Sequence, residues 1–123
     1  MSKKILVVDD EKGVVDLLYK FLSKEGFEVM IATDGKTALE RARKFLPDLI
    51  ILDVRMPDMD GGEVMAVIEE DERLRRIPVV FLTGAVSEGE ALAINQKRAG
   101  QAYISKASDI REQVKTIKKI LGV

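Results

Sequence analysis

Short apolar runs alternate with segments of helical periodicity along this chain, and that alternation limits its fold more than any other feature. Five apolar runs have the length and the β-branched content of strands. They lie at 5–8, 29–31, 49–52, 79–83 and 103–104. Strands that alternate with helices indicate a parallel sheet with helices on both faces. The continuous apolar strands agree, because strands that are covered on both sides need no polar face.

The helical segments between these runs carry their own start and stop signals. Apolar residues recur at helical spacing in segments that glycine, proline or capping residues bound. These segments lie at 14–22, 38–45, 61–68, 87–99 and 110–121. Ser108 or Asp109 is expected to cap the last one. No linker interrupts the series, so we expect residues 1–123 to form one domain, with no output domain in this chain.

The composition excludes several kinds of site. The 123 residues include no cysteine and no histidine, which removes Ser-His-Asp catalysis, thiol catalysis and zinc sites built from those side chains. Any metal must therefore sit among oxygen ligands, which favours Mg²⁺ or Ca²⁺. A net charge of −1 gives no reason to expect direct binding to nucleic acid. No apolar run approaches the roughly 18 residues of a membrane span, and no targeting signal is present, so the cytoplasm is the expected compartment.

Polar side chains gather where the predicted strands end. In an open α/β sheet, ligands bind beyond the carboxyl ends of the strands. With the strand order 2-1-3-4-5, the third strand lies between the first and the fourth. Asp53 would then have carboxylates on one side and a hydroxyl and an ammonium on the other. The residues at these strand ends are Asp9, Asp10, Glu11, Asp53, Thr83, Gly84 and Lys106.

Three clustered carboxylates repel one another unless cations compensate them. Two unit charges about 4 Å apart interact by ~1 kcal/mol in water and by ~4 kcal/mol at an effective dielectric near 20. Lys106 supplies one positive charge, and Mg²⁺ would supply the rest, since it binds through one or two carboxylates and completes its shell with phosphate oxygens. An Asp carboxylate can act as the nucleophile that takes a phosphoryl group. The strand ends therefore indicate a phosphoryl-transfer site.

The segment "LDVRMPDMDGGE" at 52–63 carries a family resemblance, together with "VVDDE", "FLTG" and "AYISK". These motifs and the order of all five β-α units resemble the receiver domains of bacterial two-component response regulators, the CheY-like family. The resemblance spans essentially the whole chain. It implies a single doubly wound (βα)5 domain of the flavodoxin-like fold, in which a five-stranded parallel sheet of order 2-1-3-4-5 has helices on both faces.

The resemblance also implies a role for each matching residue. Asp53 would be the phosphoacceptor and would also bind Mg²⁺. Asp10 would bind the ion directly and Asp9 mostly through water. The backbone carbonyl of Arg55 would complete the protein ligands of the metal. Lys106, Thr83 and the backbone N–H of Gly84 would bind the phosphoryl group. Thr83 and Tyr103 would form the switch, with Tyr103 moving inward after Thr83.

The implied partners follow from the chemistry of the phosphoryl donor. The donor would be a phosphohistidine on a sensor histidine kinase or a histidine phosphotransfer protein, and an unidentified downstream effector would read the result. The protein would catalyse its own phosphorylation and dephosphorylation and would not be an enzyme in the usual sense. No membrane and no nucleic acid is expected as a direct partner.

Several positions depart from the family pattern or stand outside its chemistry. Alanine at 107 follows the lysine where the family usually has proline, and the stretch 84–103 fits the pattern poorly. Arg55 is a further position that departs from the usual pattern, and its side chain is expected at the rim of the site. Asp58 and Asp60 are expected to serve as loop and cap residues.

A basic stripe on the last helix is expected to be a solvated face, or alternatively a docking surface for an acidic partner or a second copy in a homodimer. It consists of Arg111, Lys115, Lys118 and Lys119.

Three other functions remain open from the sequence. A Mg²⁺-dependent aspartyl-phosphate phosphatase of the haloacid-dehalogenase type would need an acid two residues after Asp53, and the chain has Arg55 there. A flavodoxin-like nucleotide binder would need a glycine- or hydroxyl-rich loop after the first strand, where the chain has "DDEKG". A degenerate receiver would be an interaction module that is never phosphorylated, which the intact set of acids, hydroxyl and lysine argues against.

Overall fold

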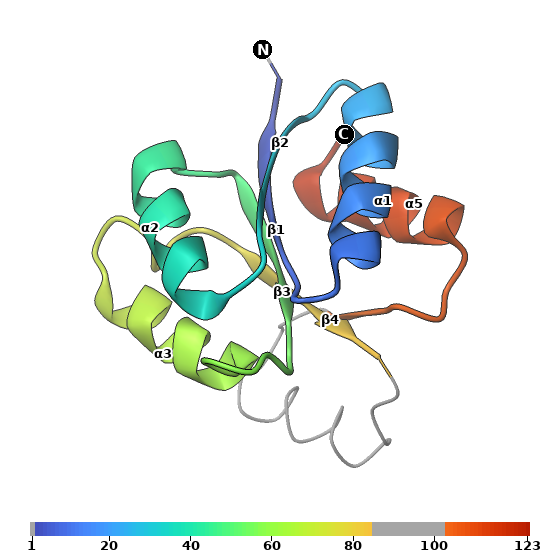
Figure 1. Ribbon diagram of the computed structural model, residues 1–123. Helices are drawn as coiled ribbons and strands as arrows, with labels where there is room; N and C mark the ends of the chain where they lie inside the picture. The colour runs from blue at the N-terminus through green and yellow to red at the C-terminus, as the bar shows by residue number, and fades with distance from the viewer. Residues whose placement is uncertain (1, 85–102) are drawn as a thin grey trace.

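The structure is a computed structural model that describes residues 2–84 and 103–123. It contains a five-stranded parallel sheet in the order β2-β1-β3-β4-β5 (Figure 1), which confirms the predicted doubly wound, flavodoxin-like fold. The helix expected over 87–99 lies outside the described residues. The strands are β1 (Lys4–Val8), β2 (Glu28–Ala32), β3 (Leu49–Asp53), β4 (Val79–Thr83) and β5 (Tyr103–Ser105). The helices are α1 (Lys12–Lys24), α2 (Gly35–Phe45), α3 (Gly61–Glu70) and α5 (Ile110–Leu121).

Helices cover both faces of the sheet, with α2 and α3 on one side and α1 and α5 on the other (Figure 1). Alternate side chains of each strand point to opposite faces, so the strands contribute to two separate cores. Leu52 and Phe81 pack toward α2 and α3, whereas Ile51 and Leu82 pack toward α1 and α5. All five residues of β3 and of β4 are buried, which explains why both strands read as unbroken apolar runs.

Aspartate side chains begin three of the described helices. Asp34 caps α2 by accepting from Thr37 N, and Asp60 forms a capping box with Glu63 at the start of α3. Asp109, one of the two expected caps, accepts from Arg111 N at the start of α5. The expectation that Asp60 is a cap residue is therefore confirmed.

The loop between β3 and α3 packs tightly against its surroundings. At Gly61, a Cβ atom would lie 2.7 Å from the Asp53 carbonyl oxygen, and Gly61 N donates to Val54 O at 2.8 Å. At Gly35, a Cβ atom would lie 2.7 Å from the Cβ of Met59. A side chain at either glycine would push the loop away, so both glycines are needed for the close approach that fixes the residues after Asp53.

Asp58 ties the same loop to α2. Its carboxylate accepts from Gly35 N at 3.1 Å through both oxygens and from Lys36 N at 3.3 Å. These hydrogen bonds, with Gly35 N first, lower the pKa of Asp58. Asp58 is thus a loop residue as expected. Its loop leads into α3, but its hydrogen-bond partners lie at the start of α2.

Among the described residues, no helix is long and apolar enough to cross a membrane.

Candidate functional site

The predicted site residues meet at the carboxyl edge of the sheet. Parallel pairing places Val8 of β1 beside Leu52 of β3. The residues that follow this pair, Asp9 and Asp53, therefore lie next to each other at the ends of the two strands. A cavity of about 300 Å³ opens at this edge. Its lining residues are Asp10, Glu11, Asp53, Val54, Arg55, Gly84 and Lys106. The strand register therefore brings together residues that are widely separated in the sequence.

Asp10 and Asp53, which line this cavity, form an acidic cluster with Asp9. Asp9 is completely buried, Asp53 is 4% exposed and Asp10 is exposed. Each offers a carboxylate oxygen that lies within 4.8 Å of the other two. Asp9 Oδ1 accepts from Glu11 N at 2.9 Å, and Asp53 Oδ1 accepts from Arg55 N at 3.3 Å. Hydrogen bonds from backbone N–H groups two residues further along the chain thus orient the two buried carboxylates.

Lys106, which directly follows the edge strand β5, reaches into this cluster. Its Nζ lies 2.7 Å from Asp9 Oδ2, 2.8 Å from Glu11 Oε1 and 3.5 Å from Asp53 Oδ2. Burial lowers the pKa of Lys106, but the hydrogen bonds and charges of these acids outweigh burial and raise it above its ordinary value. The lysine is therefore a fixed positive charge that Asp9, Glu11 and Asp53 share.

One ammonium does not compensate all of these acids. Burial, followed by the charge of Asp9, raises the pKa of Asp53 from 3.8 to about 7, although the Arg55 N–H and Lys106 act in the opposite direction. The ionised Asp53 carboxylate is thus poorly stabilised by the protein alone.

The acidic cluster suits an oxygen-ligated divalent cation. Among the described residues, the buried Oδ2 of Asp9 receives no hydrogen bond of good geometry, although the Lys106 ammonium lies beside it. Carboxylate oxygens are the ligands that Mg²⁺ and Ca²⁺ prefer, and a cation here would offset the charge that one lysine leaves. The donor set therefore fits the expected metal, with Asp9, Asp10 and Asp53 as candidate ligands.

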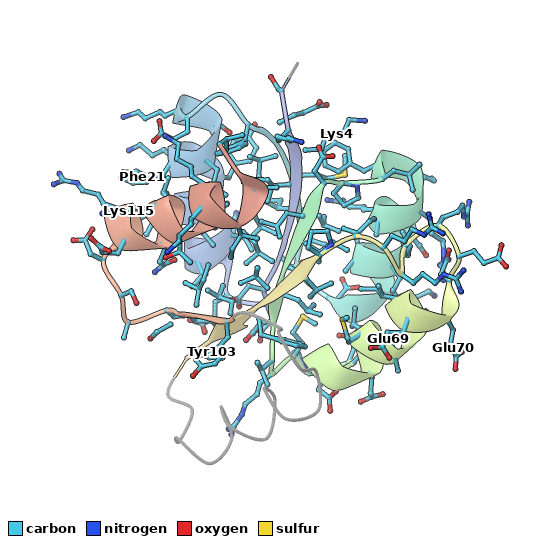
Figure 2. All side chains as sticks on the ribbon, turned by 180° about the vertical axis from the view of Figure 1, so that it is seen from behind. Lys4, Phe21, Glu69, Glu70, Tyr103 and Lys115 are labelled. Carbon is cyan, nitrogen blue, oxygen red and sulfur yellow. The ribbon has the colours of Figure 1, made fainter. Side chains whose placement is uncertain are left out.

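The two predicted switch residues lie on neighbouring strands beside this cluster. Thr83 is 3% exposed, and its hydroxyl donates to Ile104 O at 3.4 Å. Tyr103 is 40% exposed and lies at the edge of the described molecule (Figure 2). The threonine hydroxyl is thus engaged with β5, and the tyrosine ring is outside the core. Their movement stays a prediction.

The sequence left the geometry of the segment after Lys106 open, because alanine stands where the family usually has proline. Ala107 N donates to Ser105 Oγ at 3.1 Å, and Ser108 N donates to Ser105 O at 3.1 Å. Within the described ranges the backbone has no cis peptide bond, and this includes the Lys106–Ala107 bond. Hydrogen bonds hold this turn at the position where the family usually has a proline ring.

Three contacts around the site go beyond the sequence-based predictions. From the sequence, Glu11 is named only among the polar residues at the strand ends, but Glu11 shares Lys106 with Asp9. Asp58 was read as a loop residue, but it anchors α2. Gln113, in α5, was not singled out at all. The first has a signal in the sequence, since an acid beside the two aspartates invites a cation, whereas the other two depend on how the loops fold back.

The basic stripe of α5 is partly paired. Lys118 Nζ lies 3.0 Å from Glu25 Oε1 at the end of α1, while Lys115 lies on the outer side of α5 (Figure 2). Docking of an acidic partner or of a second copy on this stripe stays a prediction.

Comparison with known proteins identifies the family to which the fold belongs. The family model for the response regulator receiver domain matches residues 5–118. The polar-differentiation response regulator DivK of Brucella abortus is 34% identical over 122 residues, which are 99% of this chain and 98% of DivK.

Two solved structures agree with this comparison. The chemotaxis protein CheY4 of Vibrio cholerae has a TM-score of 0.88 at 27% identity and covers 98% of this chain and 99% of its own. A CheY-like receiver domain protein from Methanospirillum hungatei has a TM-score of 0.86 at 28% identity, covering 99% of this chain and 95% of its own. By sequence and by structure, this chain belongs to the response regulator receiver domain family.

Proposed function

We propose that this receiver accepts a phosphoryl group on Asp53 from a phosphohistidine of a sensor histidine kinase or a histidine phosphotransfer protein. The observation that supports this most is the position of Asp53, which ends a fully buried strand and faces both an acidic cluster and the Lys106 ammonium. A rigid strand end holds the carboxylate still, and the cavity beside it leaves room for the donor.

The chain's own residues supply most of the site. An Asp53 carboxylate oxygen attacks the phosphorus, a P–O bond forms, and the P–N bond of the donor breaks with its electron pair left on the imidazole. Lys106, 3.5 Å from Asp53 Oδ2, turns from the acids to the phosphoryl oxygens. The N–H of Gly84, which lines the cavity, and the Thr83 hydroxyl donate to the same oxygens.

Mg²⁺ would neutralise charge on the transferred group. Asp9, Asp10, Asp53 and the backbone carbonyl of Arg55 would hold it.

The consequence of phosphorylation is a shift between two conformations. Thr83 leaves Ile104 O for the phosphoryl group, and Tyr103 moves inward into the space beside it. A downstream effector in the cytoplasm reads the altered surface of β4 and β5. The receiver acts as a signalling protein that handles its own phosphoryl group.

Intact mass measurement tests the covalent step. The protein is incubated with Mg²⁺ and a small phosphodonor, and wild type should gain one phosphoryl group while Asp53→Asn gains none. Omission of Mg²⁺ serves as the control for the metal. Equal labelling of the Asp53→Asn variant would show that the acceptor is another residue. An unlabelled wild type would favour a receiver that acts only as an interaction module.

A further inference from the structure

Lys106 is held in place although the chain lacks the proline that usually follows this lysine in the family. A proline ring restricts its own backbone and that of the residue before it, and Ala107 does neither. The Lys106 ammonium nevertheless lies within 2.8 Å of two carboxylates and 3.5 Å from a third. Some other feature must fix the turn between β5 and α5.

The N-terminal side of this turn is held by Ser105. Lys106 N donates to Thr83 O at 2.7 Å, which fixes the residue to β4. The Ser105 carbonyl then accepts from Ser108 N, and the Ser105 hydroxyl accepts from Ala107 N, each at 3.1 Å. Lys106 is thus the second residue of a four-residue turn. The carbonyls that face α5 need donors from elsewhere.

Gln113 supplies those donors from inside α5. The residue is 6% exposed, and its Nε2 donates to Ser108 O at 2.9 Å and to Lys106 O at 3.5 Å. A glutamine amide nitrogen carries two hydrogens, and both are directed to this one turn. Glutamine is mostly exposed in proteins, so a buried one needs such partners. The second acceptor is the carbonyl of Lys106 itself.

We propose that Gln113 is a positioning residue for Lys106, assisted by the Ser105 hydroxyl. Together they fix the turn through hydrogen bonds and so set where the ammonium lies relative to Asp53. This inference rests on the proposed function, because its kinetic consequence is the pairing of Lys106 with the phosphoryl group.

Gln113→Met tests the proposal, because methionine keeps the length and packing of the side chain but has no N–H. We expect the rate constant of phosphorylation by a small phosphodonor to fall by roughly threefold to tenfold, the equivalent of one lost hydrogen bond. Mg²⁺ affinity should change by less than about twofold, since the hydrogen bonds that Gln113 Nε2 makes to the described residues go to the Lys106 and Ser108 carbonyls and not to the acidic cluster. Val114→Ala is the matched control, because Val114 is the next residue of α5, is also buried, and packs into the core between the sheet, α1 and α5 rather than against the turn. It should lower stability without slowing phosphorylation.

A double-mutant cycle separates positioning from general destabilisation. In a Lys106→Ala background, Gln113→Met should slow phosphorylation no further, because the residue that it positions is gone. A slowing as large as that in wild type would overturn the proposal, and so would a Gln113→Met variant with the wild-type rate constant.

A spectroscopic readout stands apart from phosphorylation. A fixed lysine side chain makes its two Cε protons inequivalent by NMR, and in Gln113→Met and Ser105→Ala the two Lys106 signals should converge. Ser105→Thr, which keeps the hydroxyl, should retain the wild-type separation, and so should Val114→Ala. Unchanged signals in Gln113→Met would overturn the positioning role. A wild type that takes no phosphoryl group but shows the expected convergence would overturn the proposed function while supporting the positioning of Lys106.

Discussion

Asp53 carries a consequence for stability that pH measurements can test. Burial and the charge of Asp9 raise its pKa in the folded protein to about 7, against 3.8 for the ordinary group. Between these values the folded state binds more protons than the unfolded state, so stability falls as pH rises through this window. The slope for one such group is at most about 1.4 kcal/mol per pH unit. In the absence of metal, urea unfolding of wild type should show this loss.

Asp53→Asn is the control for that measurement, since its amide does not titrate. Its stability should vary less with pH than that of wild type between about pH 4 and about pH 7. Saturating Mg²⁺ should flatten the wild-type profile, because a bound cation favours the ionised carboxylate. Parallel profiles for the two proteins would contradict the raised pKa.

The side chain of Arg55 should affect both Mg²⁺ binding and the lifetime of the phosphoaspartate. Its exposed side chain belongs to a residue that lines the same cavity as Asp10 and Asp53. We expect Arg55→Ala to bind Mg²⁺ more tightly, because a resident positive charge is removed, and its phosphoaspartate to decay faster. The change should be under about tenfold, since an exposed charge is screened by solvent. The check is a decay time course with saturating Mg²⁺, and equal half-lives would show that the Arg55 side chain does not affect hydrolysis of the phosphoaspartate.

At the scale of elements, the start of α2 packs against the loop after β3, whereas the start of α1 has free space around its glycine. Replacing glycine by alanine should therefore lower the stability of the protein in α2 and raise it in α1. Gly35→Ala places a Cβ 2.7 Å from the Met59 Cβ and should cost about 1–3 kcal/mol of overpacking. Gly13→Ala, near the start of α1, meets nothing within 4 Å and should stabilise by up to about 1 kcal/mol through helix propensity. Urea unfolding measures both. Stabilisation by Gly35→Ala would show that the loop is not held against α2.

Strands β4 and β5 should respond to phosphorylation more than the opposite edge of the sheet. A phosphoryl group adds roughly −1.5 to −2 charges at neutral pH and draws the Thr83 hydroxyl away from Ile104 O. With a stable phosphoryl mimic, the NMR signals of the Thr83, Gly84 and Tyr103 amides should move more than those of β2. Uniform shifts over the whole sheet would argue against this switch.

At the scale of the whole molecule, the features that depend on strand register could be predicted from the sequence. The fold and the meeting of Asp9, Asp53 and Lys106 follow from apolar strands that all end at one edge. The contacts of Asp58 and Gln113 did not follow, because they depend on the path of a loop and on a side chain that turns back from a helix. Single contacts of this kind leave no repeating pattern in the sequence, so they could not be predicted from it.

The ion pair between Lys106 and Glu11 joins residues that are 95 positions apart. A ribosome therefore makes the acids of the site long before it makes the lysine that neutralises them. While β5 is still inside the exit tunnel, the nascent chain has its acidic cluster but not this ammonium. During that interval ions from solution must offset more of the repulsion, so cotranslational assembly of this edge should depend on divalent cations more than the finished protein does.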